Sequence, residues 1–326
     1  MTNDTQMVTG QTFLHNEEYI REGDVVIIYV DSENILSVVV KLGTTCNMKN
    51  GALRHEFLIG KRYGTRLSAT GGPIYALRPN PPLWMKVLKR RTQILYTPEV
   101  AMIISLLDLK PGDAVCESGT GSGSLTHSLA TTVGASGHVY TYDIEEPQFE
   151  KIKAEIEQHG LQACVTPHLR NVCLDGFQVE RKCHAVFLDL PAPWLAVTHA
   201  MQVFDRSKIC RLVSFSPCIE QSQELCEKLN EFDFFNIKTV ELVTTTYRSE
   251  KSKVLTLEEL EMNRSERKVA AKRRAREDQN GNPENDEPVD LSPTLDEPKH
   301  RLLTPFPYQQ PTHAGYLTSA TLFPIE

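Results

Sequence analysis

The sequence predicts an α/β protein in which a parallel sheet wrapped by helices follows a small β-rich domain. Two observations carry this prediction. Between residues 13 and 79, short β-branched runs are separated by turn residues, a pattern that is typical of short strands. Between residues 96 and 243, strand-like runs alternate with helical runs, and such alternation gives parallel strands joined by helices.

The first domain is predicted to cover residues 1–80. Its clearest strands are the runs DVVIIYV at 24–30 and ILSVVV at 35–40, and several glycines punctuate the residues that follow. These features favour a small barrel or a sandwich. Residues 79–82 contain three prolines and are expected to form a stiff connector to the second domain.

The second domain is predicted to comprise residues 81–250 and 305–326. Strands are predicted at 114–117, 138–143, 164–168, 184–189, 209–216 and 234–243, and helices at 98–109, 122–130, 147–159, 194–204 and 218–230. Thr97 is the predicted N-cap of the first helix, and Gly160 ends the third. An alternating run at 315–323 is predicted to return as the last strand. Residues 251–304 are therefore interpreted as a charged, largely disordered insertion with a helix-like run at 258–277.

The net charge of the 326 residues is −7, but the charges are unevenly distributed. Residues 49–91 hold ten Lys or Arg and one acid, and residues 277–300 hold eight acids and one Lys. The basic block at 49–91 suits the phosphates of a nucleic acid, although a solvated face of the first domain would look the same. The basic run RKVAAKRRAR at 267–276 favours a nuclear address over a further RNA contact or a charged helix.

Composition argues against several other classes. No apolar run approaches the roughly 18 residues that span a bilayer, and the N-terminus lacks the basic-then-apolar form of a signal peptide. The eight cysteines form no C-x-x-C pair, which argues against a zinc ribbon or a thioredoxin-type site. We therefore expect an intracellular protein with reduced thiols, no membrane segment and no metal.

The run ESGTGSGS at 117–124 lies between a predicted strand and a predicted helix. Gly119, Gly121 and Gly123 let the backbone turn sharply and let a ligand approach its amides. Their spacing, G-x-G-x-G, differs from the G-x-G-x-x-G of many nicotinamide enzymes. S-adenosylmethionine has no pyrophosphate and carries an ammonium and a sulfonium, so Glu117, two residues before the first glycine, fits that ligand. The glycines alone would also be compatible with a structural turn.

Polar residues follow the next two predicted strands. Asp143 lies 22 residues beyond Gly121, and a carboxylate there can accept two hydrogen bonds from ribose hydroxyls. The alternative is a solvated acid, since Glu145 and Glu146 are close by. Asn171 and Val172 follow the next strand, where the adenine edge lies in such folds.

The run LDLPAPW at 188–194 ends another predicted strand at the carboxyl edge of the sheet, where open α/β sheets bind ligands. Amino-group methyltransferases often carry an acid or amide, then proline, then an aromatic residue at this place. Asp189 is therefore interpreted as a catalytic or base-orienting residue in preference to a helix N-cap. Next to an amino group of the substrate, its carboxylate would accept a hydrogen bond and stabilise positive charge that develops there. Trp194 is equally open to stacking on a base and to packing in the core.

These runs, together with SFSPCIEQ at 214–221, RTQILY at 91–96, GALRH at 51–55 and HAGYLT at 313–318, resemble one family. It is the family of catalytic subunits of the tRNA (adenine-N1)-methyltransferases that modify adenine 58 of tRNA. The resemblance extends through nearly the whole chain outside 1–15 and 250–305. It implies a Rossmann-like class I methyltransferase fold with a mostly parallel seven-stranded sheet, preceded by a small N-terminal β-barrel domain. It also implies S-adenosylmethionine as cofactor, tRNA as substrate, and a heterotetramer of two catalytic and two non-catalytic chains.

The resemblance also implies contacts for individual residues. With the loop residues named above, the predicted cofactor site comprises Leu95, Glu117, Gly119, Gly121, Ser122, Gly123, Ser124, Asp143, Gln148, Asn171, Val172 and Asp189. The predicted tRNA contacts are Gly72, Gln93, Tyr96, Thr97, Pro191, Trp194, Ser214, Phe215, Ser216, Pro217 and Gln221. The chain departs from the family pattern at Gln148, where arginine can occur, and at Asp143, where some relatives carry glutamate.

Three alternative functions remain compatible with the sequence. The first is a methyltransferase that acts on another RNA site or on a protein. The second is a catalytically silent subunit with the same fold, which would be expected to lose the glycine run or the Asp189 run; both are intact here. The third is a nicotinamide oxidoreductase, against which the glycine spacing argues.

Overall fold

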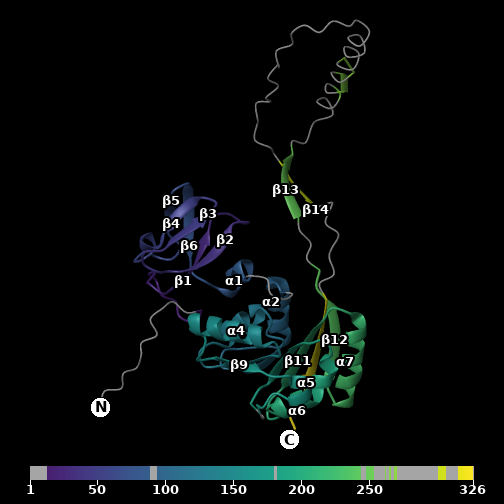
Figure 1. The fold of residues 1–326 in the computed structure, drawn as a ribbon. Coiled ribbons are helices and arrows are strands. Elements are labelled where there is room, and N and C mark those ends of the chain that lie inside the picture. Colours follow the sequence, from purple (N-terminus) through teal and green to yellow (C-terminus); the bar gives the residue numbers. More distant parts are fainter. Residues whose placement is uncertain are drawn as a thin grey trace, which may run out of the picture. The chain divides into compact units, whose positions relative to one another are not determined.

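The computed structural model describes residues 13–88, 94–179, 182–243, 247–252, 261, 264–265, 268–269, 300–305 and 315–325 (Figure 1). They belong to two compact units, one within 1–242 and 313–326 and the other within 243–312. None of the helices in the described ranges is both long and apolar enough to cross a membrane.

The first unit begins with an antiparallel β domain, which confirms the β-rich region expected from the sequence. Its four-stranded sheet has the order β2-β1-β6-β5, and the strands are β1 (Val25–Tyr29), β2 (Ile35–Val39), β5 (Arg66–Ala69) and β6 (Gly72–Leu77). A separate hairpin pairs β3 (Thr45–Met48) with β4 (Gly51–Arg54), and the short 3₁₀ helix η1 (His55–Phe57) follows it. Alternate residues such as Val26, Ile28 and Ile74 form the core of this domain, as the two-residue period of a strand requires.

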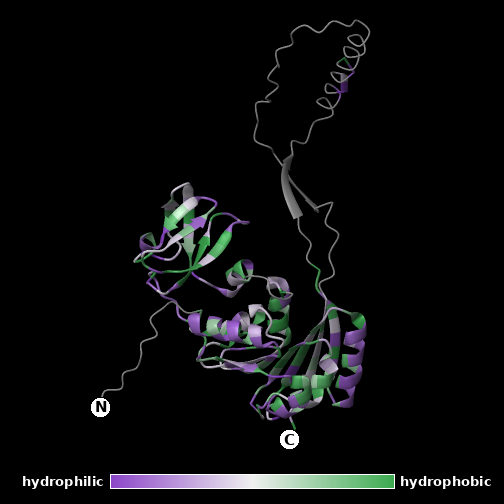
Figure 2. Cartoon of the chain, in the orientation of Figure 1, coloured by the Kyte–Doolittle hydropathy of each residue, from purple (hydrophilic) through white to green (hydrophobic). Residues whose placement is uncertain are grey.

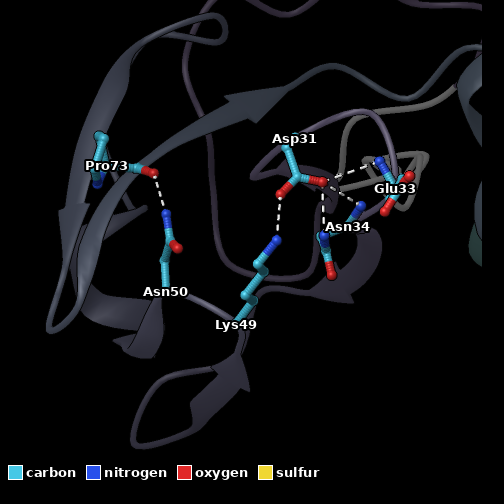
Figure 3. Close-up of polar contacts among 6 residues, drawn as sticks. All are labelled: Asp31, Glu33, Asn34, Lys49, Asn50 and Pro73. Atoms are coloured by element: carbon cyan, nitrogen blue, oxygen red, sulfur yellow. Dashed lines mark hydrogen bonds and ion pairs between the residues drawn. The ribbon is translucent and has the colours of Figure 1, made fainter. Parts of the chain in front are cut away.

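The hairpin turns of the β domain are joined by polar contacts (Figure 3). Lys49 Nζ lies 3.0 Å from a carboxylate oxygen of Asp31, and the amide nitrogen of Asn50 donates to the Pro73 carbonyl over 2.9 Å. Gly72 begins β6 directly after the turn that follows β5, and an ideal Cβ there would lie 3.0 Å from the Asn50 amide nitrogen, which is a tight contact. The turns after β1, β3 and β5 thus support one another.

The connector prediction for residues 79–82 is wrong. Pro81 opens helix α1 (Pro81–Val87), because proline lacks only an amide hydrogen that the first turn of a helix leaves unpaired anyway. Asn80 is the N-cap, and its side-chain oxygen accepts a 2.9 Å hydrogen bond from the Leu83 amide. Helix α1 buries Trp84 against Val25 and Ile27 of β1, so it packs on the β domain.

The rest of the first unit is built on a seven-stranded sheet of order β12-β15-β11-β10-β7-β8-β9. Five strands are parallel neighbours, β15 runs antiparallel between β11 and β12, and the predicted mostly parallel sheet is confirmed. The strands are β7 (Ala114–Ser118), β8 (His138–Asp143), β9 (Val165–Leu169), β10 (Ala185–Asp189), β11 (Cys210–Ser216), β12 (Phe235–Glu241) and β15 (Tyr316–Leu322).

Helices cover both faces of this sheet. One buried core includes Ile103, Leu129 and Ile152 from three helices, and a second core on the other face includes Ala200 and Leu225. Helices α4 and α7 carry mainly hydrophilic residues on their outward surfaces (Figure 2). The helices are α2 (Thr97–Leu106), α3 (Ser124–Val133), α4 (Glu146–Gln158), α5 (Val172–Asp175), α6 (Val197–Val203) and α7 (Ile219–Glu231), with the 3₁₀ helix η2 (Pro193–Ala196) before α6.

Two helix predictions need correction. The N-cap of α2 is Tyr96 and not Thr97, and the helix ends three residues early, because Asp108 adopts a left-handed φ of 52° that a helix cannot continue. The single helix predicted at 194–204 is divided into η2 and α6. The short helix α5 was not predicted from the sequence.

The second unit contains an antiparallel hairpin of β13 (Tyr247–Ser252) and β14 (His300–Pro305). The ends of the predicted insertion therefore pair with each other. The unit that contains the seven-stranded sheet comprises residues 1–242 and 313–326, and the domain limits at 250 and 305 stay predictions. Most of the predicted helix-like run at 258–277 and all of the residues between 277 and 299 lie outside the described residues.

Candidate functional site

A cavity of about 780 Å³ opens at the carboxyl edge of the seven-stranded sheet, in the size range of small-molecule sites. Its walls come from the residues that follow β7, β8, β9 and β10, together with the segment before α2 and the start of α7. Parallel strands that end at one edge bring these segments together, although they are far apart in the chain. This edge is where ligands bind in open α/β folds.

The glycine loop that follows β7 forms one wall of the cavity. Gly119, Gly121 and Gly123 all have positive φ angles, of 95°, 53° and 73°. An ideal Cβ on Gly119 would lie 2.3 Å from the Asp189 carbonyl oxygen, so only glycine allows the loop to press against the end of β10. The Gly121 amide donates a 2.9 Å hydrogen bond to the Asp143 carboxylate, which ties the loop to the end of β8.

Carboxylates dominate the charge of the cavity. Its described lining contains four acids, Glu117, Asp143, Glu145 and Asp189, and one cation, Arg170. Burial raises the pKa of Glu117 to about 7, although Thr126 donates a 2.7 Å hydrogen bond to it. Burial likewise raises the pKa of Asp189 to about 6. No salt bridge joins Glu117 to any described residue. The cavity therefore suits a cationic ligand and repels a pyrophosphate.

Asp189 is held in place by the segments around it. The Ser214 hydroxyl donates to the Leu188 carbonyl over 3.0 Å, and the Gln221 amide nitrogen donates to the Pro191 carbonyl over 2.8 Å. The side-chain oxygen of Gln221 accepts a 3.1 Å hydrogen bond from the Cys218 amide. Gln221 therefore joins the loop after β10 to the start of α7.

The structure brings most of the predicted cofactor residues to this cavity. Those that line it are Leu95, Glu117, Gly119, Gly121, Ser122, Ser124, Asp143, Asn171, Val172 and Asp189. Gly123 and Gln148 do not line it. Gly123 faces Ile152 instead, where an ideal Cβ would lie 2.6 Å from the Ile152 side chain. Gln148 lies in the first turn of α4, and its side-chain oxygen is buried without a hydrogen-bond partner.

The predicted tRNA residues are more dispersed. Pro191, Pro217 and Gln221 line the cavity. Tyr96 and Thr97 lie at the start of α2 just outside its wall, Gly72 begins β6 of the β domain, and Gln93 is outside the described residues. Contacts of these residues with tRNA remain predictions.

The predicted residues of β11 lie within the fold. Ser214 and Ser216 are fully buried. The ring of Phe215 packs against Gly315, where an ideal Cβ would lie 2.4 Å from the nearest ring atoms. These three residues support the end of the strand and do not line the cavity. Their positions favour a structural role over the predicted substrate contact.

Sequence reasoning missed several lining residues. Trp194 is half-buried in η2 and does not line the cavity, whereas the next residue, Leu195, lines it and is 53% exposed. Ile144 and Leu174 are other exposed apolar residues of the lining. Each of the three lies within two residues of a predicted contact, and this proximity is the only feature of the sequence that indicates their position in the lining.

Several cations of the basic block at 49–91 form ion pairs with acids of the same chain. Lys49 pairs with Asp31 at 3.0 Å, Arg62 with Glu18 at 3.0 Å and Arg54 more loosely with Glu56 at 3.9 Å. Two of these acids lie outside the block in sequence and lower its local charge. Because exposed ion pairs are weak, phosphates could still compete for these cations.

A sequence model of one protein family, described as the tRNA methyltransferase complex GCD14 subunit, matches residues 72–322. The chain belongs to this family. A relative from Candida albicans, named tRNA (adenine(58)-N(1))-methyltransferase catalytic subunit TRM61, is 38% identical over 313 residues, which cover 94% of this chain and 87% of that protein. A Dictyostelium discoideum relative with the corresponding name is 38% identical and covers 72% of this chain and 76% of its own length.

Two TRM61 relatives from Cryptococcus neoformans are 39% identical to this chain over 278 residues, which cover 81% of it. The chain matches 64% of the length of those relatives, which is less than two thirds.

Solved structures support the fold assignment of this family member. A SAM-dependent O-methyltransferase from Thermotoga maritima superposes with a TM-score of 0.69 at 22% identity and covers 95% of this chain and 96% of its own. The tRNA (m1A58) methyltransferase TrmI from Aquifex aeolicus gives a TM-score of 0.63 at 20% identity, with 93% and 98% covered. The predicted class I methyltransferase fold is thus confirmed.

Proposed function

We propose that this chain is a catalytic subunit that transfers a methyl group from S-adenosylmethionine to N1 of adenine 58 in the T-loop of tRNA. The observation that carries the proposal is the position of Asp189. Asp189 lines the same cavity as the glycine loop, and its backbone lies against Gly119. The names of the relatives from Candida albicans and Dictyostelium discoideum support this choice of substrate.

The residues present fit the methyl donor of this fold. S-adenosylmethionine, when bound, supplies an electrophilic methyl group on a sulfonium. Glu117, buried without a cationic partner among the described residues, would hold the positive amino acid portion. Asp143 would accept hydrogen bonds from the ribose, since its carboxylate has lone pairs beyond those used by the Gly121 and Glu145 amides. The close approach of Gly119 to β10 places the glycine loop beside Asp189.

Besides its predicted contact with the donor, Asp189 would act on the adenine. Its pKa of about 6 leaves it mainly ionised above pH 7, so it accepts a hydrogen bond from the 6-amino group. This bond raises the electron density on N1, whose lone pair forms the new N–C bond, and stabilises the positive charge left on the base. The base must leave its stack to reach a residue that lines a cavity, so we expect it to be extruded from the folded RNA.

The partner and the location also belong to this proposal. We propose a complex with a non-catalytic methyltransferase-fold subunit, two copies of each, located in the nucleus. Two features support a partner: the net charge of −7 and the ion pairs that occupy Lys49 and Arg62. A chain of this charge is expected to bind tRNA weakly alone. The nuclear location rests on the basic run at 267–276, most of which lies outside the described residues.

The alternatives fit the site less well. A nicotinamide oxidoreductase would have to place a pyrophosphate among four acids. A silent subunit would have no need to keep Asp189 in the cavity. A methyltransferase for another RNA or for a protein shares the same cavity and must be separated by experiment.

The test is a methylation assay with the tagged chain, purified together with the subunits that accompany it. Radiolabelled S-adenosylmethionine is supplied with unmodified tRNA and with a matched tRNA that carries guanine at position 58. We expect label in the first tRNA only, and a primer-extension stop at position 58, because N1 methylation blocks base pairing. Equal label in both tRNAs, or label in protein, would contradict the proposed substrate. Binding of the donor without any transfer would favour the silent subunit.

The raised pKa of Glu117 predicts a pH dependence of cofactor binding. The cation binds the ionised form, so protonation below a pKa of about 7 weakens binding. The affinity for S-adenosylmethionine should rise about tenfold between pH 5.5 and pH 7 and then level off. Calorimetric titration of the wild type and of Glu117→Gln checks this, because the amide keeps an acceptor for Thr126 but has no charge to lose. An equal pH slope in both proteins would remove Glu117 from the explanation.

A further inference from the structure

Two buried histidines lie directly behind the glycine loop. His127 belongs to α3 and His159 follows the last turn of α4, and both are 1% exposed. The Nε2 atom of His127 is 2.7 Å from the Nδ1 atom of His159. Neither residue lines the cavity, and the proposed chemistry does not use them.

The hydrogen bonds of this pair have one direction. The Nδ1 atom of His127 is 2.6 Å from the Gly123 carbonyl oxygen, which can only accept, so this nitrogen carries the hydrogen. The Nε2 atom of His127 is then an acceptor, and the Nδ1 atom of His159 donates to it. Burial lowers the pKa of His127 to about 4 and that of His159 to about 3, so both rings are neutral at physiological pH, as this arrangement requires.

Aromatic rings enclose the pair. The ring centroid of Phe13 lies 5.0 Å from that of His127 and 4.9 Å from that of His159, and the Trp84 ring lies 5.7 Å and 4.5 Å from the same two. The Phe13 amide also donates to the His159 carbonyl over 3.3 Å. The segment before the β domain and helix α1 therefore help to hold the histidines in place.

Gly123 connects this pair to the cofactor loop. It has a left-handed φ of 73° and precedes the first residue of α3, and its amide donates to the Thr120 carbonyl over 2.8 Å. Residues 119–122 line the cavity, whereas the Gly123 carbonyl accepts hydrogen bonds from the His127 amide over 3.2 Å and from the His127 ring. The loop is thus anchored on the side opposite to the ligand.

We infer that His127 is a positioning residue for the cofactor loop, which it holds in the binding conformation by donating its Nδ1 hydrogen to the Gly123 carbonyl. This inference rests on the proposed role of the loop in binding S-adenosylmethionine. A preorganised loop loses less conformational freedom on binding than a mobile one. Because only the loop is affected, the consequence falls on cofactor affinity and not on the methyl-transfer step.

Three substitutions of His127 separate its two hydrogen bonds. Asparagine places an amide nitrogen where Nδ1 lies and keeps the donor to Gly123. Glutamine extends past that point toward His159 and loses the Gly123 bond, and leucine loses both. Calorimetric titration of the full chain with S-adenosylmethionine should give a Kd about tenfold higher for His127→Leu and His127→Gln, as expected for the loss of one hydrogen bond, and a Kd within about threefold of wild type for His127→Asn. At saturating cofactor, the rate of methyl transfer by the complex should be nearly the same for all three.

Two further variants make the outcomes decisive. His55→Leu removes another buried histidine, 4% exposed in the β domain, and should lower the melting temperature without a change in Kd. Asp143→Ala tests the proposed site itself and should weaken cofactor binding. The inference is overturned if His127→Leu binds like wild type while Asp143→Ala does not, or if His127→Asn is as weak as His127→Leu. If Asp143→Ala also binds normally, it is the proposed cofactor site that is wrong.

Discussion

Replacing Asp189 with alanine is expected to reduce methyl transfer to tRNA by roughly 10²- to 10³-fold, the usual cost of removing a group that stabilises developing charge. The carboxylate lines the cavity, and its pKa of about 6 keeps it ionised at the pH of the assay. Without it, the positive charge on the methylated adenine loses the carboxylate that is proposed to accept a hydrogen bond from the 6-amino group. Single-turnover transfer at saturating cofactor measures the effect directly.

The same substitution should leave folding intact. Burial raises the pKa of Asp189, which means that its ionised form is disfavoured in the folded protein, so its removal should leave the melting temperature unchanged or slightly higher. Asp205→Asn is the matched control, because Asp205 is half-buried outside the cavity lining and accepts hydrogen bonds from Ser207, and this variant should transfer methyl groups like the wild type. Turnover near the wild-type rate in Asp189→Ala would remove this residue from the chemistry.

Gly119→Ala is expected to weaken S-adenosylmethionine binding by about 100-fold or more and to abolish measurable transfer. A methyl group at this position would lie 2.3 Å from the Asp189 carbonyl oxygen and 3.1 Å from its Cβ, both of which the strand end holds in place. The φ of 95° adds backbone strain of about 1–3 kcal/mol for any residue other than glycine. The loop must therefore move away from β10, which deforms the cofactor site and displaces the catalytic carboxylate together.

Gly134→Ala provides a control for the strain alone. Gly134 has a φ of 67°, but a Cβ there would meet no atom within 4 Å. Both variants should therefore lose some thermal stability, and only Gly119→Ala should lose cofactor affinity. Equal affinities in the two variants would show that the contact between the loop and Asp189 is not needed for binding.

The sequence by itself determined the order of strands and helices and the residues at the strand ends. Hydrophobic periodicity and turn residues are local signals, and they were sufficient to predict β7, β8, β10 and the returning strand β15 nearly to the residue. Because parallel strands end at one edge, the sequence alone assigns the acids at 117, 143 and 189 to one site. The same signals gave a wrong prediction for residues 79–82. Proline breaks the interior of a helix, but Pro81 and Pro82 occupy the first turn of α1 after the N-cap Asn80, where proline is tolerated.

Only the tertiary structure decided which side chains meet. Leu195 and not Trp194 reaches the cavity, because the 3₁₀ turn of η2 rotates the residues after Pro193 in a way that periodicity does not encode. The contact of Gly119 with Asp189, the bond from Gln221 to Pro191 and the histidine pair behind Gly123 all join residues from different strands and helices. Contacts of this kind depend on the register and packing of whole strands and helices. The sequence therefore predicts which residue types form the site, and only the folded structure gives the distances between them.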